Sequence, residues 1–589
     1  MRSTLARSIT ALVLVTVVAC TTPPPAATVI SVTIDGGDRT IVLGDTPTLT
    51  ATVEVTGNAS PAVTWASSDE TVATIAADGQ VTSLTAGTTT LTATSTADAT
   101  KSGAMTLTIS EADGVISVTI DGGDRITLLA GILTLTATVE TTGNASTTVT
   151  WTSSNTAVGT IESTSGSVTS LTTGTTNITA TSTADPTKSD TITLTINPLG
   201  VLRWTRQFGT SSGDYATGIA TDANGNVYAT GYTGGALAGP NAGNSDAFIR
   251  SYDSAGNLRW TRQFGTSSDD FAFGIATDAN GNVYATGYTF GVLTGSSAGG
   301  VDAFIRSYDR DGNLRWTRQF GTSSEDVAFG IATDANGNVY ATGYTFGALE
   351  GSNAGSRDAF IRSYDSAGNL LWTRQFGTSS NDDAFGIATD ANGNVYATGY
   401  TFGALEGSNA GGRDAFIRSY DRDGNLRWTR QFGTSSNDEA RGIATDTNGN
   451  VYATGYTLGA LAGPNAGGRD AFIRSYDRDG NLLWTRQFGT SSIDDAFGIA
   501  TDANRNVYAT GYTLGALAGP NAGGADAFIR SYDRNGSLRW TRQFGTSSSD
   551  FARGIATDTN NVYTTGETSG ALTGSSAGGV DVFIRSYGR

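Results

Sequence analysis

Carboxylate, aromatic and guanidinium groups recur at fixed intervals through the C-terminal part of the chain. These groups are the first candidates for binding a ligand or a partner. One aspartate returns every 56 residues, as Asp214, Asp270, Asp326, Asp382, Asp438, Asp494 and Asp550. Two roles are open to it. Each aspartate could cap a loop by accepting hydrogen bonds from backbone N–H groups, or the seven together could form a carboxylate ring that binds cations or sugar hydroxyls.

A second repeated position lies three residues after each of these aspartates. It reads Thr217, Phe273, Phe329, Phe385, Arg441, Phe497 and Arg553. Exposed aromatic and arginine side chains are effective anchors for a partner. We therefore predict that this position, just before the innermost strand of each repeat, rims the mouth of a central channel and forms a binding face with the aspartates.

Two kinds of short acidic segment have the oxygen ligands that calcium prefers. They are represented by Asp222–Asn226 (Asp-Ala-Asn-Gly-Asn) and Asp309–Asn313 (Asp-Arg-Asp-Gly-Asn). A calcium loop of the EF-hand type has its glycine at the sixth position, whereas here glycine is fourth. A glycine there suits the left-handed residue of a hairpin turn. We interpret the segments as turns and expect no metal or other cofactor, with Ca²⁺ as the alternative.

The composition narrows the possible catalytic chemistry. The 589 residues include no histidine and one cysteine, Cys20. Histidine-based triads and zinc bound by histidine or cysteine are therefore excluded. Paired carboxylates remain possible, but an active site usually breaks the symmetry of a repeat array, and no repeat stands apart in this way. We expect a protein that is not an enzyme and has no catalytic residues.

The charge of the chain indicates which partners it avoids. Its formal net charge is −18, whereas nucleic-acid binding requires clustered lysine and arginine. We expect no nucleic-acid partner, and a monomer kept apart from its copies by self-repulsion.

The elements that position the candidate residues follow from the repeat. Tryptophans recur every 56 residues at Trp204, Trp260, Trp316, Trp372, Trp428, Trp484 and Trp540. Each copy contains four strand-like runs, GIATD, NVYATGYT, DAFIRSY and LRWTRQFG, and Asn-Gly or Asp-Gly dipeptides mark hairpins between them. Four antiparallel strands repeated seven times describe a seven-bladed β-propeller over residues 200–589.

The ends of the repeat region predict how the ring closes. The region opens with a lone LRWTRQFG run (Leu202–Gly209) and ends on DVFIRSYGR (Asp581–Arg589). The first run can therefore complete the last blade, in a one-plus-three closure that leaves no exposed strand edge. A linear stack is the alternative, but it would need capping repeats. The "DANGNVYATGYT" hairpin and the "DAFIRSYD" strand closely resemble the SBBP bacterial β-propeller repeat family, which implies an exported bacterial protein more than any activity.

A different repeat precedes the propeller. The run Val29–Asp38 returns as Val115–Asp124, and Trp65 returns as Trp151, both after 86 residues. Each copy holds about seven short alternating segments, as in a small β-sandwich. The copies, 28–110 and 115–197, resemble the bacterial immunoglobulin-like (Big, group 2) domain, which implies spacers without a site of their own; a binding role is the alternative. The predicted fold class is all-β: two Ig-like sandwiches, then the propeller.

The first residues resemble an export signal. Arg2 and Arg7 precede an apolar core, and residues 1–20 end in Val-Val-Ala-Cys, which is similar to the bacterial lipobox. The resemblance implies lipidation of Cys20, and residues 21–27 would form a Pro/Thr tether. We expect an exported protein anchored to a bacterial membrane through the lipid on Cys20, most consistent with the outer membrane and cell surface.

These expectations combine into one hypothesis and two alternatives. The first is a non-catalytic, lipid-anchored surface protein for adhesion or recognition, whose propeller binds an extracellular protein or glycan. The second is an envelope assembly or scaffold lipoprotein that faces the periplasm. The third is a polysaccharide-degrading propeller enzyme.

Overall fold

The structure is a computed structural model that describes residues 26–128 and 132–589. The predicted signal peptide, the lipidation site Cys20 and most of the predicted tether lie outside the described residues. The described chain is all-β, without a helix. It divides into two compact units, and the division along the sequence falls between Ile196 and Asn197.

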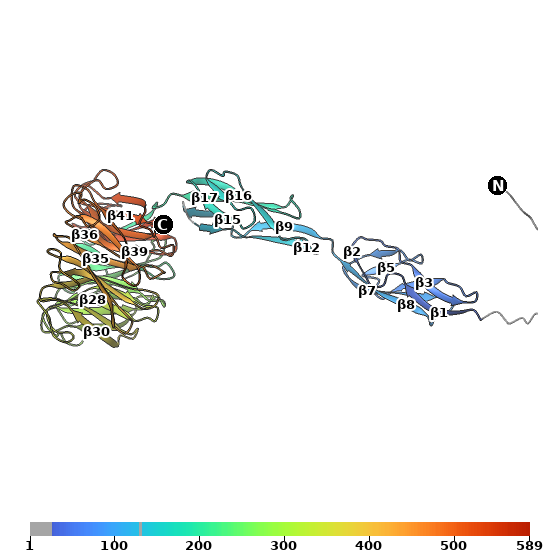
Figure 1. Cartoon of the computed structure of the whole chain (residues 1–589), viewed down its shortest axis with the longest axis horizontal. Helices are drawn as coiled ribbons and strands as arrows, with labels where there is room; N and C mark the ends of the chain where they lie inside the picture. The colour runs from blue at the N-terminus through green and yellow to red at the C-terminus, as the bar shows by residue number, and fades with distance from the viewer. Residues whose placement is uncertain (1–25, 129–131) are drawn as a thin grey trace, which may run out of the picture. The chain divides into compact units, whose positions relative to one another are not determined.

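The first Ig-like domain comprises eight strands, coloured blue in Figure 1. They are β1 (Thr28–Ile34), β2 (Arg39–Val42), β3 (Ala51–Thr56), β4 (Val63–Ser67), β5 (Ala73–Ile75), β6 (Val81–Ser83), β7 (Gly87–Ser95) and β8 (Ser102–Ser110). The largest sheet has the order β2-β8-β7-β4, with β2 parallel to β8, and β1 pairs with β3. The alternation in β7 buries Leu91 and Ala93 in a core against which Trp65 packs.

The second Ig-like domain has nine strands. They are β9 (Gly114–Ile120), β10 (Arg125–Leu128), β11 (Ile132–Thr134), β12 (Ala137–Thr142), β13 (Val149–Ser153), β14 (Gly159–Ile161), β15 (Ser167–Ser170), β16 (Gly174–Ser182) and β17 (Ser189–Asn197). Its sheets are β10-β17-β16-β13, β11-β15-β14 and β12-β9. Trp151 is buried among Ile178, Ala180 and Leu194, so the core forms around this tryptophan as the sequence predicted.

The propeller consists of four-stranded antiparallel blades, and we call their strands a to d from the channel outward. The a strands are β19 (Asp214–Thr221), β23 (Asp270–Thr277), β27 (Asp326–Thr333), β31 (Asp382–Thr389), β35 (Asp438–Thr445), β39 (Asp494–Thr501) and β43 (Asp550–Thr557). The b strands are β20 (Val227–Thr233), β24 (Val283–Thr289), β28 (Val339–Thr345), β32 (Val395–Thr401), β36 (Val451–Thr457), β40 (Val507–Thr513) and β44 (Asn561–Thr568).

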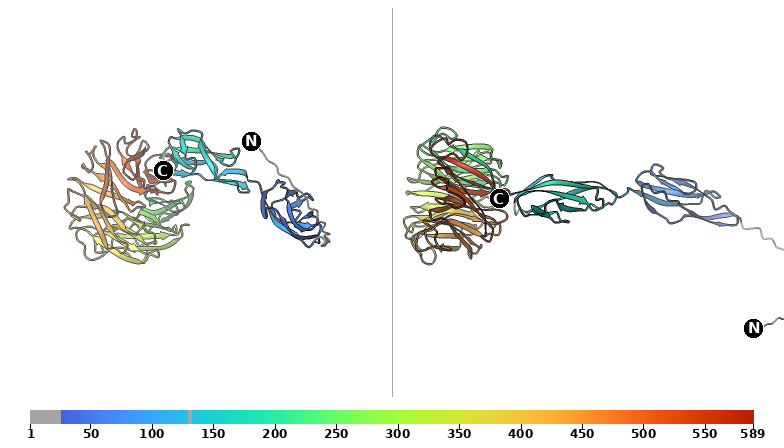
Figure 2. Two further views of the ribbon diagram at one scale, coloured as in Figure 1. Left: turned by 45° about the vertical axis from the view of Figure 1, so that its right-hand side comes forward. Right: turned by 90° about the horizontal axis from the view of Figure 1, so that it is seen from above.

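The outer two strands of each blade complete the sheets. The c strands are β21 (Asp246–Tyr252), β25 (Asp302–Tyr308), β29 (Asp358–Tyr364), β33 (Asp414–Tyr420), β37 (Asp470–Tyr476), β41 (Asp526–Tyr532) and β45 (Asp581–Gly588). The d strands are β22 (Leu258–Phe264), β26 (Leu314–Phe320), β30 (Leu370–Phe376), β34 (Leu426–Phe432), β38 (Leu482–Phe488) and β42 (Leu538–Phe544). Chain order, from green to red in Figures 1 and 2, follows the blades around the ring.

The seventh blade takes its d strand from the start of the unit. Strand β18 (Leu202–Phe208) pairs antiparallel with β45, and the sheet order is β18-β45-β44-β43. Two further backbone hydrogen bonds, Gly200 N to Gly588 O and Gly588 N to Val201 O, extend this pairing. Blade seven is therefore composed of the two ends of the propeller unit.

The a strands also bond to one another around the channel. Each a strand ends in a threonine whose hydroxyl donates to the carbonyl oxygen of the equivalent threonine in the preceding blade, at 2.7 to 2.8 Å. The set is Thr221, Thr277, Thr333, Thr389, Thr445, Thr501 and Thr557. The hydrogen bond from Thr221 to Thr557 completes the circle, so every pair of adjacent blades has the same contact at this end of the channel.

The d strands connect each blade to the next on the outside. The indole N–H of Trp316 donates to the carbonyl oxygen of Ser366 at 3.0 Å, in the c–d turn of the following blade. Arg318 donates through Nε to Gly368 O in the same turn at 2.6 Å. These bonds satisfy carbonyl groups that a tight turn leaves unpaired. The repeated Trp-Thr-Arg segment is thus an interblade connector.

Candidate functional site

The predicted rim residues lie at a β-bulge inside strand a. We predicted that they precede the innermost strand, but that strand begins at the aspartate four residues earlier than the GIATD run, so this prediction was wrong in detail. In blade two the register shifts between Ala272 and Gly274, which leaves Phe273 unpaired. A bulge redirects the side chain of its extra residue. The same shift occurs in all seven a strands.

The bulged side chains surround one cavity of about 500 Å³ at the loop end of the channel. Every blade contributes to this cavity, which we call the mouth. Its lining comprises Tyr215, Thr217, Tyr232, Phe273, Phe329, Phe385, Glu439, Arg441, Phe497, Arg553 and Glu567. The mouth therefore contains all seven residues that the second repeated position predicted.

The mouth has an aromatic half formed by blades two to four. The ring centroids of Phe273 and Phe329 are 5.3 Å apart, and those of Phe329 and Phe385 are 5.2 Å apart. Phe273 also stacks on Tyr288, which contacts Phe290 at 5.8 Å. Aromatic pairs at such distances form a continuous apolar surface. This surface extends outward to Phe290, Phe346 and Phe402, which are 39% to 49% exposed.

The other half of the mouth carries charge. The guanidinium carbons of Arg441 and Arg553 lie 4.4 and 4.5 Å from the ring centroid of Phe497, so both arginines contact this ring. Arg553 pairs with Glu567 at 2.6 Å, and Arg441 approaches Glu439 at 3.4 Å. Burial raises the pKa of Glu567, although Arg553 opposes that shift, and burial lowers the pKa of Arg441. The polar groups of this half therefore bond mainly to one another.

Two glutamates of the mouth were not among the predicted site residues. Glu567 replaces a tyrosine of the "NVYATGYT" run, and Glu439 follows the repeated aspartate where Tyr215 and Phe271 stand in other blades. A blade-by-blade comparison of these positions would have identified them. Each stands in the blade whose bulge position is arginine, which is the signal of the pairing.

The repeated aspartates have a structural role. All seven are 0% exposed, and each accepts a hydrogen bond of 2.6 to 2.7 Å from the backbone N–H of the threonine four residues earlier. In blade one, Asp214 also accepts the hydroxyl protons of Thr210 and Thr233. Their inclusion in the binding face was wrong, because these fully buried carboxylates do not line the mouth; they cap the d–a loops.

The acidic turns are hairpins in the described structure. Oδ1 of Asp278 accepts the N–H groups of Asn280 and Asn282, and Oδ2 accepts from the Asn282 amide and the Tyr284 hydroxyl, all at 2.7 to 2.9 Å. Gly281 has φ +79°, the left-handed conformation predicted for the fourth residue. Within residues 26–128 and 132–589, no group of three or more His, Cys, Asp or Glu side chains is arranged to hold a metal ion.

Charged pairs cross three of the blade boundaries near the mouth. They join Arg357 to Asp383 at 3.1 Å, Arg413 to Glu439, and Arg469 to Asp495 at 3.0 Å. The equivalent positions in blades two and three are Val301 and Val327, both buried. The loop face is therefore divided into an ion-paired sector and an apolar sector.

Among the described residues, no helix is long and apolar enough to cross a membrane.

Comparison with known families supports this architecture. Seven segments match the beta-propeller repeat (SBBP), at residues 203–237, 259–293, 315–349, 371–405, 427–461, 483–517 and 539–572. Two match the bacterial Ig-like domain (group 2), at residues 28–105 and 115–192. The chain is thus a bacterial Ig-like and β-propeller protein. Its C-terminal unit is composed of SBBP repeats and its N-terminal unit of two Big group 2 domains, which confirms both resemblances.

The chain is also similar to larger proteins. The regulatory protein FlaEY of Caulobacter vibrioides is 26% identical over 43% of this chain and 31% of its own length. An uncharacterized WD repeat-containing protein of Acanthamoeba polyphaga mimivirus is 24% identical over 54% of this chain and 31% of its own. The chain thus spans about a third of the length of these relatives. The WD40 beta propeller domain of Doa1 aligns with a TM-score of 0.40 and 11% identity, over 66% of this chain and 97% of that one.

The combination of domains is consistent with a protein-interaction or surface protein. Bacterial Ig-like domains are typical of extracellular and surface proteins. The β-propeller provides a ring whose loop face includes an apolar sector.

Proposed function

We propose that this chain is an exported, non-catalytic recognition protein whose propeller binds a polypeptide partner at the mouth. The lipid predicted on Cys20 holds it on the outer surface of a bacterial membrane, and the Ig-like domains act as spacers. The observation that carries the proposal is the aromatic half of the mouth with its exposed extension through Phe290, Phe346 and Phe402. Exposed contiguous apolar surface of this kind marks interaction sites.

A polypeptide fits this mouth better than a glycan does. Sugar hydroxyls need unpaired polar groups that converge on them, whereas Arg553 and Glu567 already bond to each other. An apolar or aromatic side chain of a partner, in contrast, would bury surface against Phe273, Phe329 and Phe385 and gain about 25 cal/mol per Å² of apolar area removed from water. We therefore expect segments with exposed aromatic residues to bind.

A peptide library tests this proposal. The purified chain should enrich peptides with aromatic anchors, and Phe329→Ala combined with Phe385→Ala should weaken binding of a selected peptide by about tenfold or more. The matched control is Leu370→Ala, which removes a 48% exposed apolar side chain at the start of β30, and it should leave binding unchanged. Equal binding by the double variant and the parent would refute the mouth as the site.

The location is tested separately. Protease treatment of intact cells should remove the propeller, because a surface protein is accessible while a periplasmic one is protected. A propeller that survives on intact cells but is digested after the outer membrane is opened would refute surface display.

A further inference from the structure

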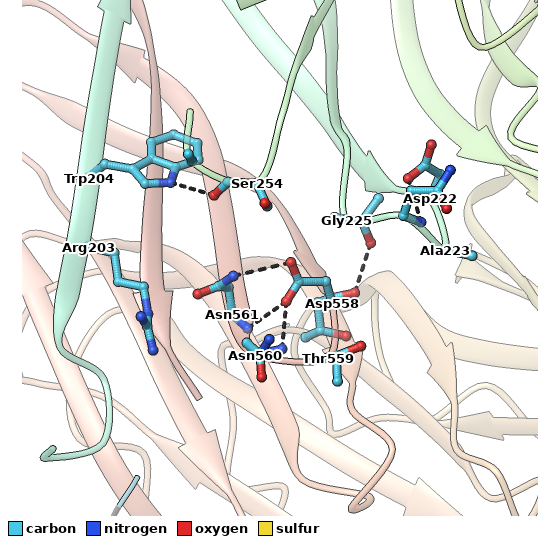
Figure 3. A pocket seen from close by; sticks show the side chains of 14 residues that line it. Arg203, Trp204, Asp222, Ala223, Gly225, Ser254, Asp558, Thr559, Asn560 and Asn561 are labelled. Carbon is cyan, nitrogen blue, oxygen red and sulfur yellow. Dashed lines mark hydrogen bonds between the residues drawn. The ribbon is translucent and has the colours of Figure 1, made fainter. Parts of the chain in front are cut away.

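A second cavity, of about 810 Å³, lies on the opposite end of the ring from the mouth, between blade seven and blade one. We call it the junction cavity (Figure 3). It is bounded by β18, by the a–b and c–d turns of blade one and by the a–b turn of blade seven. Its lining includes Arg203, Trp204, Ser254, Asp558, Asn560 and Asn561. The cavity was not among the predicted sites.

The cavity exists where an interblade arginine is absent. In blades two and four, an arginine of the c–d turn donates to a carbonyl oxygen of its own a–b turn, as from Arg310 to Asn280 at 3.1 Å. It also approaches the a–b turn aspartate of the preceding blade, as from Arg422 to Asp334 at 3.6 Å. In blade one the equivalent residue is Ser254, and the space that a guanidinium would occupy is open.

The a–b turn of blade seven widens the opening. Its sequence Asp558-Thr559-Asn560-Asn561 lacks the glycine of the other copies. The equivalent aspartates in the six other blades are 4% to 6% exposed, whereas Asp558 is only half-buried. The shorter turn therefore presents a carboxylate that the complete turns enclose.

Arg203 is released from the contact that its equivalents make. Arg259, Arg315, Arg427 and Arg539 each approach the hydroxyl of a b-strand tyrosine at 3.2 to 3.4 Å. The corresponding hydroxyl, of Tyr563, donates to Asp558 at 2.6 Å and accepts from Asn561 at 3.0 Å. Arg203 is exposed and makes no hydrogen bond or ion pair with any residue that the structure describes.

Asn561 adds an independent sign of a ligand site. The residue is 8% exposed, and its side-chain oxygen has no hydrogen-bond partner in the described chain. Buried polar atoms nearly always have partners. In Figure 3 this oxygen lies on the side of Asn561 that faces Arg203.

We propose that the junction cavity binds a saccharide of one or two sugar rings. Its wall has two unpaired polar groups, the Arg203 guanidinium and the Asn561 side-chain oxygen. Beside them lie the Ser254 hydroxyl, the ring of Trp204 and the half-buried Asp558 carboxylate, which already accepts four hydrogen bonds from Asn560, Asn561 and Tyr563. Sugar hydroxyls both donate and accept, so they match this mixture, and their C–H faces suit an indole. A phosphate ligand would need several cations, and Asp558 would repel it; an apolar ligand would leave the amides unpaired. The volume lies within the range of about 300–1,000 Å³ typical of small-molecule sites.

The chain itself supplies variants that test this site without endangering the fold. Ser254→Arg copies Arg310 and fills the cavity. Arg203→Leu copies Leu371 and Leu483, which occupy the equivalent position in other blades. A glycine inserted between Asn560 and Asn561 recreates the Asp446–Asn450 turn of blade five. The matched control is Ser366→Arg, which makes the same change beside a complete a–b turn.

The experiment is a saccharide array probed with the full chain, followed by calorimetry with the best-bound sugar. Ser254→Arg, Arg203→Leu and the glycine insertion should each weaken binding by about tenfold or more, because a charge-assisted bond or the space itself is lost. Ser366→Arg, and Phe329→Ala with Phe385→Ala, should bind as the parent does. Absence of any saccharide binding, or binding that Ser254→Arg leaves unchanged, overturns the proposal. Peptide binding tests the mouth and saccharide binding tests the junction cavity, with different variants for each. A failure of peptide binding therefore does not affect this result.

Discussion

The guanidinium of Arg357 lies 3.1 Å from the carboxylate of Asp383, across the boundary between blades three and four. Asp383 is 3% exposed and also accepts the hydroxyl proton of Tyr400. Burial raises the pKa of Asp383, and the Tyr400 bond and Arg357 oppose the shift. At the preceding boundary, between blades two and three, the equivalent residues are Val301 and Val327. The same pair of positions is thus charged at one boundary and apolar at the other.

This relationship predicts strong coupling in a double-mutant cycle. Arg357→Val alone should lower the free energy of unfolding by about 1–3 kcal/mol, because it leaves the buried Asp383 carboxylate without its cation. Arg357→Val with Asp383→Val copies the earlier boundary and should recover most of the loss. Urea unfolding of the parent, both single variants and the double variant measures the coupling. Additive effects of the two substitutions would contradict the prediction.

Arg505 should be a destabilising residue. It has φ +63° and is the one non-glycine residue with positive φ in the described chain, at a position that is Gly281 or Gly393 in other blades. A side chain in this conformation costs about 1–2 kcal/mol. Arg505→Gly should therefore raise the free energy of unfolding by about 1 kcal/mol. The reciprocal change Gly449→Arg should lower it by a similar amount. Urea unfolding measures both variants, and a less stable Arg505→Gly or a more stable Gly449→Arg would refute the strain.

Phenylalanines of the core and of the mouth should respond differently to truncation. Phe416 is 0% exposed and contacts Phe376 at a centroid distance of 5.8 Å, so Phe416→Ala should cost about 3–5 kcal/mol. Phe385 lines an open cavity, and Phe385→Ala should cost about 1 kcal/mol or less. Thermal unfolding of the two variants makes the comparison. A large loss in Phe385→Ala would mean that the mouth is part of the core.

The buried aspartates should give the propeller a pH dependence of defined sign. Burial raises the pKa of Asp382 above 3.8, although hydrogen bonds from Thr378 oppose the shift. The folded state then binds the proton more tightly than the unfolded chain does. The protonated Asp382 carboxyl therefore stabilises the folded state. This contribution is complete at pH values below the pKa of Asp382 in the unfolded chain, and it is lost as the pH rises through the higher pKa of Asp382 in the folded chain.

The test compares the parent with Asp382→Asn, which cannot titrate, in urea unfolding at several pH values above about 4. The stability advantage of the parent over the variant should shrink as the pH rises through this window. An advantage that grows with pH would show that the carboxylate is favoured in its charged form and would contradict the prediction.

Removal of β18 should open the ring. A chain that begins at residue 210 lacks the partner of β45, whose backbone groups would then form an exposed edge that pairs with other chains. We expect oligomers by size-exclusion chromatography with light scattering, whereas a chain that begins at Asn197 should remain monomeric. Monomers of both would indicate that the edge is protected in another way.

The sequence predicted the blades because their signals are local. The tryptophan step of 56 residues and the glycines of the hairpin turns need no knowledge of neighbouring blades. The bulge at Phe273 was placed outside its strand, because the repeated aspartate reads as a loop residue although it pairs with Thr289. Contacts across blade boundaries, such as Arg357 with Asp383, form only when the ring closes. In the sequence they are visible only as two positions that change together from one blade boundary to the next.

The junction cavity was missed for a related reason. The substitution of Ser254 for arginine, the shorter Asp558 turn and the free Arg203 lie far apart in the sequence. Each is a small departure from the repeat when taken alone. Only the closure of the ring brings blade one against blade seven and combines the three departures in one place.

The shared blade also determines how the propeller bears force. Tension on the chain that precedes Asn197 would reach the propeller where its two ends are joined. Leu199 and Gly200 accept hydrogen bonds from Arg542 of blade six, and β18 pairs with β45 of blade seven, so two adjacent blades would share the load. Because no turn joins β18 to β45, blade seven is the one blade in which the load would be borne by backbone hydrogen bonds between the two ends of the unit.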